Sequence, residues 1–133
     1  MKRGDKMAKI LLIDDDEDFL EILTNILQKA GYELSTLTSG EEVTDEIIRF
    51  KPDIVITDIL MPGITGGYVY EEIRRETGPD LPVIIASGTT MKIIAPEDKC
   101  IGYCPKPIDY PYLLETIKKL LSQSSDASEN HST

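Results

Sequence analysis

Four apolar runs in this sequence each end in, or lead into, a side chain that can do chemistry. Asp14 and Asp15 follow the first run, Asp58 follows the second, Ser87 ends the third, and Lys106 follows the fourth. If each run is a buried parallel strand, these groups project from the carboxyl edge of one sheet, where open α/β sheets bind their ligands. Three carboxylates, a hydroxyl and an ammonium in one crevice suit a divalent cation and a phosphoryl group.

The three carboxylates would be crowded at such an edge. Two carboxylates about 4 Å apart repel by roughly 4 kcal/mol at an effective dielectric near 20, so one is protonated or a cation lies between them. A small hard cation with oxygen ligands meets this need, and Mg²⁺ also accepts a phosphate oxygen. The chain therefore offers a candidate magnesium site formed by Asp14, Asp15 and Asp58.

A carboxylate can also act as the nucleophile that forms an aspartyl-phosphate. Asp58 is the best candidate because it ends a central strand and lies outside the acidic pair. Lys106 would then neutralise one phosphoryl oxygen, and the Ser87 hydroxyl would donate to another.

The elements that must position these groups alternate between strand-like runs and helical patterns, which predicts a parallel sheet with helices on both faces. We expect strands over 10–13, 33–37, 54–56, 83–86 and 101–104, and helices over 19–30, 41–48, 66–76 and 110–121. The stretch between Ser87 and Lys106 should hold a fourth crossover helix. Its β-branched residues and Pro96 weaken a helix, so we expect that helix to be short or irregular.

Size and composition indicate one globular domain. The chain has 133 residues, of which 41% are hydrophobic and 29% are charged. We expect an N-terminal extension over 1–8, the domain over 9–121 and a disordered polar tail over 122–133. This tail is too short to hold a DNA-binding domain.

The charge and the apolar segments narrow the possible partners and compartment. The net charge of −10 disfavours direct binding to nucleic acid and gives no reason to expect attraction to membranes. No segment reads as a signal peptide or a membrane span, so the protein is expected to be cytoplasmic. Cys100 and Cys104, with no second pair, read as small apolar residues rather than zinc ligands.

Taken together, these residues resemble the receiver domain of two-component response regulators, the family of the bacterial chemotaxis regulator. The resemblance covers the chain from Lys9 to Leu121. It implies a doubly wound, flavodoxin-like sheet of five parallel strands in the order 2-1-3-4-5, with helices on both faces. Its motifs are the acidic pair Asp14-Asp15, the phosphoacceptor Asp58, the turn Met61-Pro62 with Gly66, the hydroxyl of Ser87, and Lys106-Pro107.

The resemblance also implies a ligand set for the metal. Asp15 would bind Mg²⁺ directly, Asp14 mainly through water, and Asp58 as the third carboxylate. The backbone carbonyl of Leu60 would complete the protein ligands, and Mn²⁺ is a possible substitute for Mg²⁺.

Two further positions have roles implied by the resemblance. Tyr103 falls on the position of the family's switch aromatic. The Lys106-Pro107 peptide bond is expected to be cis, an isomer open mainly to proline, and it would fix the direction of the lysine.

The function implied is that of a stand-alone receiver. A histidine kinase or a phosphotransfer protein would transfer a phosphoryl group to Asp58, and Ser87, Lys106 and Tyr103 would respond and switch a partner-binding surface. The chain would be a switch with at most slow self-dephosphorylation rather than a turnover enzyme. It would signal to a protein effector or an onward phosphorelay, as a monomer or a phosphorylation-dependent dimer.

Three alternatives stay open on the sequence. The first is a receiver-like interaction module that does not depend on phosphorylation, suggested by the irregular stretch Thr89 to Cys100. The second is a metal-dependent phosphatase or other phosphotransfer enzyme on the same fold. The third is a flavodoxin, which would need a phosphate-binding loop where this chain has aspartates.

Overall fold

Five parallel strands form the central sheet. The computed structural model describes residues 7–58, 60–61, 64–88 and 100–132, and it describes side chains for 7–58, 69–88 and 100–123. The strand order β2-β1-β3-β6-β7 corresponds to 2-1-3-4-5 in chain order, so the predicted doubly wound sheet is confirmed. The bounds are β1 Lys9–Ile13, β2 Glu33–Leu37, β3 Ile54–Thr57, β6 Val83–Ser87 and β7 Ile101–Pro105.

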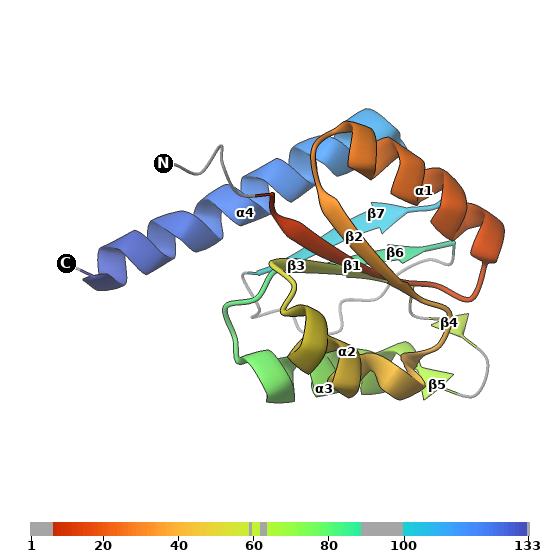
Figure 1. Cartoon of the computed structure of the whole chain (residues 1–133), viewed down its shortest axis with the longest axis horizontal. Helices are drawn as coiled ribbons and strands as arrows, with labels where there is room; N and C mark the ends of the chain where they lie inside the picture. The colour runs from red at the N-terminus through yellow and green to blue at the C-terminus, as the bar shows by residue number, and fades with distance from the viewer. Residues whose placement is uncertain (1–6, 59, 62–63, 89–99, 133) are drawn as a thin grey trace.

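Four α-helices in the described part of the chain cover the two faces of this sheet. Helices α1 and α4 lie on one face, and α2 and α3 lie on the other (Figure 1). A short 3-10 turn, η2, precedes α2. The bounds are α1 Glu17–Lys29, η2 Gly40–Glu42, α2 Val43–Phe50, α3 Gly66–Thr77 and α4 Tyr110–Ser132.

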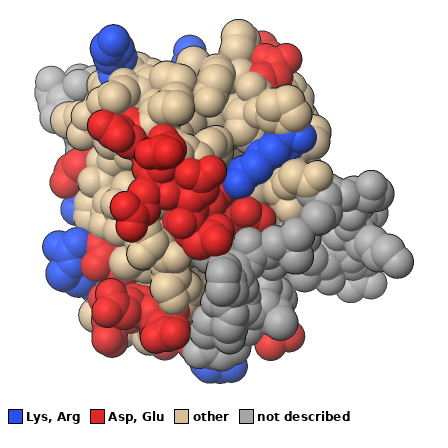
Figure 2. Space-filling view, turned by 90° about the vertical axis from the view of Figure 1, so that its right-hand side faces the viewer, with Lys and Arg blue, Asp and Glu red and all other residues tan. Residues whose placement is uncertain are grey.

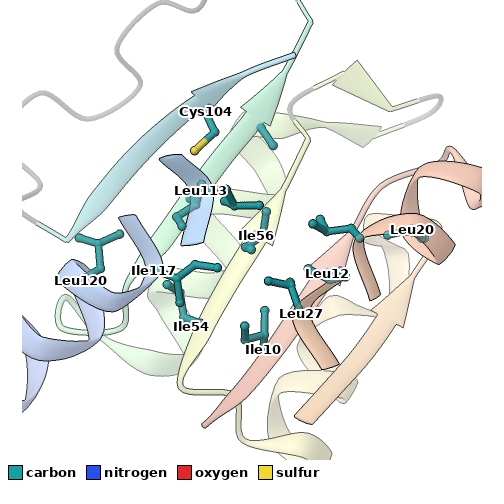
Figure 3. Packing of buried hydrophobic residues seen from close by; sticks show 13 residues of the cluster. Ile10, Leu12, Leu20, Leu27, Ile54, Ile56, Cys104, Leu113, Ile117 and Leu120 are labelled. Carbon is teal, nitrogen blue, oxygen red and sulfur yellow. The ribbon is translucent and has the colours of Figure 1, made fainter. Parts of the chain in front are cut away.

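The alternation of side chains along the strands divides the core into two clusters. In β1, Ile10 and Leu12 pack with α1 and α4, whereas Leu11 and Ile13 pack with α2 and α3. Strands β1, β3 and β6 are buried on both faces, which explains their continuous apolar runs. The buried residues of the α1/α4 cluster, drawn in Figure 3, are Ile10, Leu12, Leu20, Leu23, Leu27, Ile54, Ile56, Ile84, Ala86, Cys104, Leu113, Ile117 and Leu120.

The edge strand β7 is less buried than the central strands. Ile101, Gly102 and Tyr103 are each half-buried, and only Cys104 of this strand is buried. A Cβ at Gly102 would lie 3.2 Å from atoms of both Leu120 and Thr116. Helix α4 therefore packs directly on the backbone of β7 at this glycine.

Local sequence signals set the ends of the helices. Asp16 caps α1, because its side chain accepts a hydrogen bond of 3.1 Å from the Phe19 backbone N–H. Gly31, just after this helix, has a φ of 101°, a left-handed conformation that favours glycine. Asp109 similarly accepts from the Tyr112 backbone N–H at 3.1 Å, at the start of α4.

The structure differs from the sequence predictions at two places. Helix α4 continues to Ser132, where we expected a disordered tail over 122–133, because no glycine or proline follows Pro111 to end it. A short antiparallel hairpin of β4 (Leu60–Met61) and β5 (Ile64–Thr65) follows β3 and was not predicted. The expected short fourth crossover helix falls on residues 89–99, outside the described residues.

None of the helices among the described residues is both long and apolar enough to cross a bilayer.

Candidate functional site

The parallel register brings the predicted chemical groups to one edge of the sheet. Asp14 follows β1, Asp58 follows β3, Ser87 ends β6 and Lys106 follows β7. Backbone hydrogen bonds fix these ends side by side: Asp58 N–H donates to the carbonyl oxygen of Ile13 at 3.0 Å, and Lys106 N–H donates to that of Ser87 at 2.8 Å. The site therefore draws on four strands that are far apart in the sequence.

Three carboxylates gather at this edge. Asp14, Asp15 and Asp58 each offer one oxygen, and these oxygens all lie within 4.8 Å of one another. Asp14 and Asp58 are only 2% and 7% exposed, whereas Asp15 is exposed. Figure 2, which faces the side where β1 and β6 end, shows a broad group of acidic side chains beside a basic one. Closely spaced hard oxygens of this kind fit Mg²⁺.

The ammonium of Lys106 lies between the two buried carboxylates. Its Nζ donates to Oδ2 of Asp14 at 2.7 Å and to Oδ2 of Asp58 at 3.1 Å. Burial would lower the pKa of Lys106, but its hydrogen bonds to the two aspartates outweigh this effect and raise the pKa. The group holds three carboxylates, and Lys106 contacts two of them with its one ammonium, so the site keeps a negative charge that a divalent cation would neutralise.

The pKa of Asp14 is also raised, but here burial is the cause. Its burial raises its pKa, and the hydrogen bonds from Lys106 and from the Asp16 backbone offset this rise only in part. Asp14 is almost fully buried, whereas the Lys106 side chain is 23% exposed, so desolvation weighs more on the carboxylate. The space below Asp14 and Asp58 is too small for a water molecule, and the site is therefore dry on its inner side.

The remaining predicted residues lie on β6, on or just after β7, and on β4. Ser87 is fully buried at the end of β6, and the Lys106–Pro107 peptide bond is cis, as the resemblance implied. Tyr103 packs against the α2/α3 cluster, and its hydroxyl is buried without a hydrogen-bond partner among the described residues. Leu60 begins β4 two positions after Asp58, and its side chain lies outside the described side chains.

Two residues that the sequence analysis did not assign to the site also touch it. Thr57 is fully buried, and its hydroxyl donates to the backbone carbonyl of Asp58 at 3.0 Å. The Phe19 ring, at the start of the helix predicted over 19–30, lies with its centroid 4.4 Å from Nζ of Lys106. The position of Phe19 in the first turn of the helix after Asp14 was the only signal for this contact.

Comparison with known families agrees with this geometry. A model of the response regulator receiver domain matches residues 10–118 of the chain. The chain belongs to the response regulator receiver family. This receiver matches the family over nearly all of its core and over all four strand ends that form the site.

Curated relatives of this receiver are longer proteins. It is 33% identical over 119 residues to the transcriptional regulatory protein YxdJ of Bacillus subtilis, an alignment that covers 89% of this chain and 52% of that protein. It is 34% identical over 127 residues to the transcriptional regulatory protein GlrR of Escherichia coli, covering 93% and 28% of the two. The chain thus spans about half the length, or less, of these curated relatives.

Solved structures match this receiver over nearly their whole length. The response regulator TrrA of Thermotoga maritima, solved in complex with Mg²⁺-BeF, is 33% identical, with a TM-score of 0.76, and the match covers 86% of this chain and 99% of that one. The chemotaxis protein CheY4 of Vibrio cholerae is 27% identical, with a TM-score of 0.79 and the same two coverages.

Proposed function

We propose that this receiver accepts a phosphoryl group on Asp58, in a Mg²⁺-dependent reaction, from a histidine kinase or a phosphotransfer protein. The observation that carries the proposal is the ammonium of Lys106, which contacts both Asp14 and Asp58 within a group of three carboxylates. Such a site attracts a divalent cation and provides a positive charge for an anionic phosphoryl group. The Mg²⁺-BeF complex of the similar TrrA supports the choice of metal.

In the proposed reaction a carboxylate oxygen of Asp58 attacks the phosphorus atom of a phosphohistidine. The new oxygen–phosphorus bond forms, the bond from phosphorus to the imidazole nitrogen breaks, and that nitrogen keeps the electron pair. Lys106 would turn from the carboxylates toward a phosphoryl oxygen, and the Ser87 hydroxyl would donate to another.

The metal would be held by this chain's own oxygen atoms. Asp14, Asp15 and Asp58 would supply carboxylate oxygens, and Leu60 would supply its backbone carbonyl. When bound, Mg²⁺ supplies the positive charge that lets the anionic phosphoryl group approach a carboxylate, and Mn²⁺ would serve in its place.

We further propose that phosphorylation changes a partner-binding surface through Ser87, Lys106 and Tyr103. The hydroxyl of Tyr103 supports this, because it is buried and has no hydrogen-bond partner among the described residues. A buried hydroxyl without a partner costs about 1–3 kcal/mol, which favours a rearrangement that gives it one. The effector would be a protein, because the net charge of −10 disfavours nucleic acid. The proposed unit is a cytoplasmic receiver over 9–121, monomeric or dimerising on phosphorylation, that acts as a stand-alone switch and not a turnover enzyme.

Intact-mass measurement after incubation with acetyl phosphate, with and without Mg²⁺, tests this function. We expect one phosphoryl adduct that requires Mg²⁺ and is absent in Asp58→Asn. Asp45→Asn, which changes an exposed aspartate of α2 away from the site, is the matched control and should be modified like the wild type.

Other outcomes would favour the alternatives. A folded, Mg²⁺-treated protein that gains no adduct would favour an interaction module that works without phosphorylation. Multiple turnovers on a small phosphate ester would instead favour a phosphotransfer enzyme.

A further inference from the structure

An aromatic ring covers the ammonium of the site. Nζ of Lys106 lies 4.4 Å from the centroid of the Phe19 ring while it contacts Asp14 and Asp58 through hydrogen bonds. A cation within about 6 Å of a ring centroid is attracted by the negative face of the π-system. The ammonium is thus held by two carboxylates and by a ring from a different element, α1.

Two hydrogen bonds connect the backbone of Phe19 to the acidic group. Asp16 N–H donates to Oδ1 of Asp14 at 2.9 Å, and Phe19 N–H donates to Oδ1 of Asp16 at 3.1 Å. The ring then faces Nζ of Lys106, which donates to Oδ2 of Asp14 at 2.7 Å. These contacts close a loop of four residues that starts and ends at Asp14. The helix cap at Asp16 therefore positions the backbone of Phe19, from which the ring reaches the ammonium.

The ring also closes the dry side of the site. Phe19 lines the space below Asp14 and Asp58 that is too small for water, and it packs against the α1/α4 cluster. Phe19 is half-buried and the Lys106 side chain is mostly buried, so the contact between ring and ammonium is partly desolvated. Cation–π contacts are stronger when water is excluded. Lys106 keeps only its outer side open to solvent, since its side chain is 23% exposed.

We propose that Phe19 is a positioning residue that holds the ammonium of Lys106 against Asp14 and Asp58. This inference deepens the proposed function and rests on it, because the held ammonium lies where the phosphoryl group would arrive. It also has a consequence before any phosphorylation. The ammonium and Mg²⁺ draw on the same two carboxylates, those of Asp14 and Asp58, so a ring that holds the ammonium weakens Mg²⁺ binding.

Three variants test the inference with readouts that need no phosphorylation. Phe19→Leu keeps an apolar side chain but removes the ring, and Phe19→Tyr restores a ring. Phe50→Leu is the matched control, because Phe50 is the other phenylalanine of the chain and stacks on a different lysine, with Nζ of Lys9 5.4 Å from its centroid. The readouts are the NMR shifts of the Lys106 ε-methylene protons and the dissociation constant for Mg²⁺ followed in the same spectra.

We expect the ε-methylene protons to be shifted upfield by the ring in the wild type and in Phe19→Tyr, but not in Phe19→Leu. Mg²⁺ should bind about two- to fivefold more tightly to Phe19→Leu, the change expected from loss of one cation–π contact, and Phe19→Tyr should return to the wild-type value. Phe50→Leu should leave both readouts unchanged.

The proposal is overturned if Lys106 shows no ring-current shift in the wild type, or if Phe19→Leu and Phe19→Tyr bind Mg²⁺ equally well. If Phe50→Leu does not fold, the comparison of the two Phe19 variants still decides the matter. Failure of the proposed function is a separate result. In that case acetyl phosphate would leave Asp58 unmodified while the shifts and the Mg²⁺ affinities still followed the ring.

Discussion

Replacing Lys106 with methionine removes the positive charge from the centre of the site and keeps the length of the side chain. At an effective dielectric near 20, the contacts of 2.7 Å to Asp14 and 3.1 Å to Asp58 each correspond to a direct attraction of about 5–6 kcal/mol. Desolvation of the ammonium offsets much of this attraction, and breaking a buried pair by removing one partner costs about 3–5 kcal/mol in total.

We expect Lys106→Met to lower the free energy of unfolding by about 3 kcal/mol near neutral pH without Mg²⁺, at the low end of that range because the lysine side chain is 23% exposed. The fold should survive, since domains of this kind have roughly 5–15 kcal/mol of stability. Urea unfolding measures the loss as a lower midpoint with an unchanged slope. Lys118→Met, at an exposed position of α4, is the matched control and should have little effect.

The pH dependence of the stability loss in Lys106→Met distinguishes a loss of charge interactions from a loss of packing. The pKa of Lys106 is raised on folding from 10.5, so its contribution is fully present below that value and is lost only as the pH rises through the higher folded pKa. On the acid side, burial raises the pKa of Asp14 above 3.8, so this carboxyl takes up its proton at a higher pH in the folded than in the unfolded protein. The difference between wild type and variant should therefore shrink on acidification, and also on saturation with Mg²⁺. An equal loss of stability at neutral and at acid pH would refute the electrostatic reasoning.

Three further predictions concern residues around the site. Tyr103→Phe should raise the free energy of unfolding by about 1 kcal/mol, because it removes a buried hydroxyl without a partner among the described residues; a lower urea midpoint would contradict this. Gly102→Ala should lower the free energy of unfolding by about 1–3 kcal/mol, because the added Cβ would lie 3.2 Å from atoms of Leu120 and Thr116. An unchanged urea midpoint would show that α4 can shift to make room for the methyl group. Leu60→Asn should speed loss of the phosphoryl group, because we expect the apolar side chain to keep water away; a phosphoprotein lifetime by mass spectrometry that stays the same or lengthens would reject that role.

The meeting of Asp14 and Asp58 could be predicted because each follows a continuously apolar strand, and parallel strands align their carboxyl ends. The same logic placed Lys106 beside them, on the strand next to the one that ends in Ser87. These predictions needed only the strand pattern and the family resemblance. They did not need the conformation of any side chain.

The contacts that the sequence did not reveal depend on side-chain direction or on weak local signals. Phe19 has the spacing of an ordinary core residue, and only the packed positions of α1 and β7 bring its ring over Lys106. The hairpin of β4 and β5 has two residues in each strand, too few for a periodic pattern. The end of α4 was missed because its polar residues, which suggested disorder, contain no residue that ends a helix.

The strands that carry the site residues are not equally buried, so one part of the site should be more rigid than the other. Asp14, Asp58 and Ser87 are attached to the three strands that are buried on both faces, whereas Tyr103 and Lys106 belong to the half-buried edge strand β7 or follow it. Local opening requires less free energy where fewer apolar contacts are lost, so the backbone amides of β7 should exchange with solvent faster than those of β1 and β3. Asp58, the proposed nucleophile, and the acidic pair are thus anchored on the rigid strands. The edge strand can move Lys106 and Tyr103 relative to them without loosening the centre of the sheet.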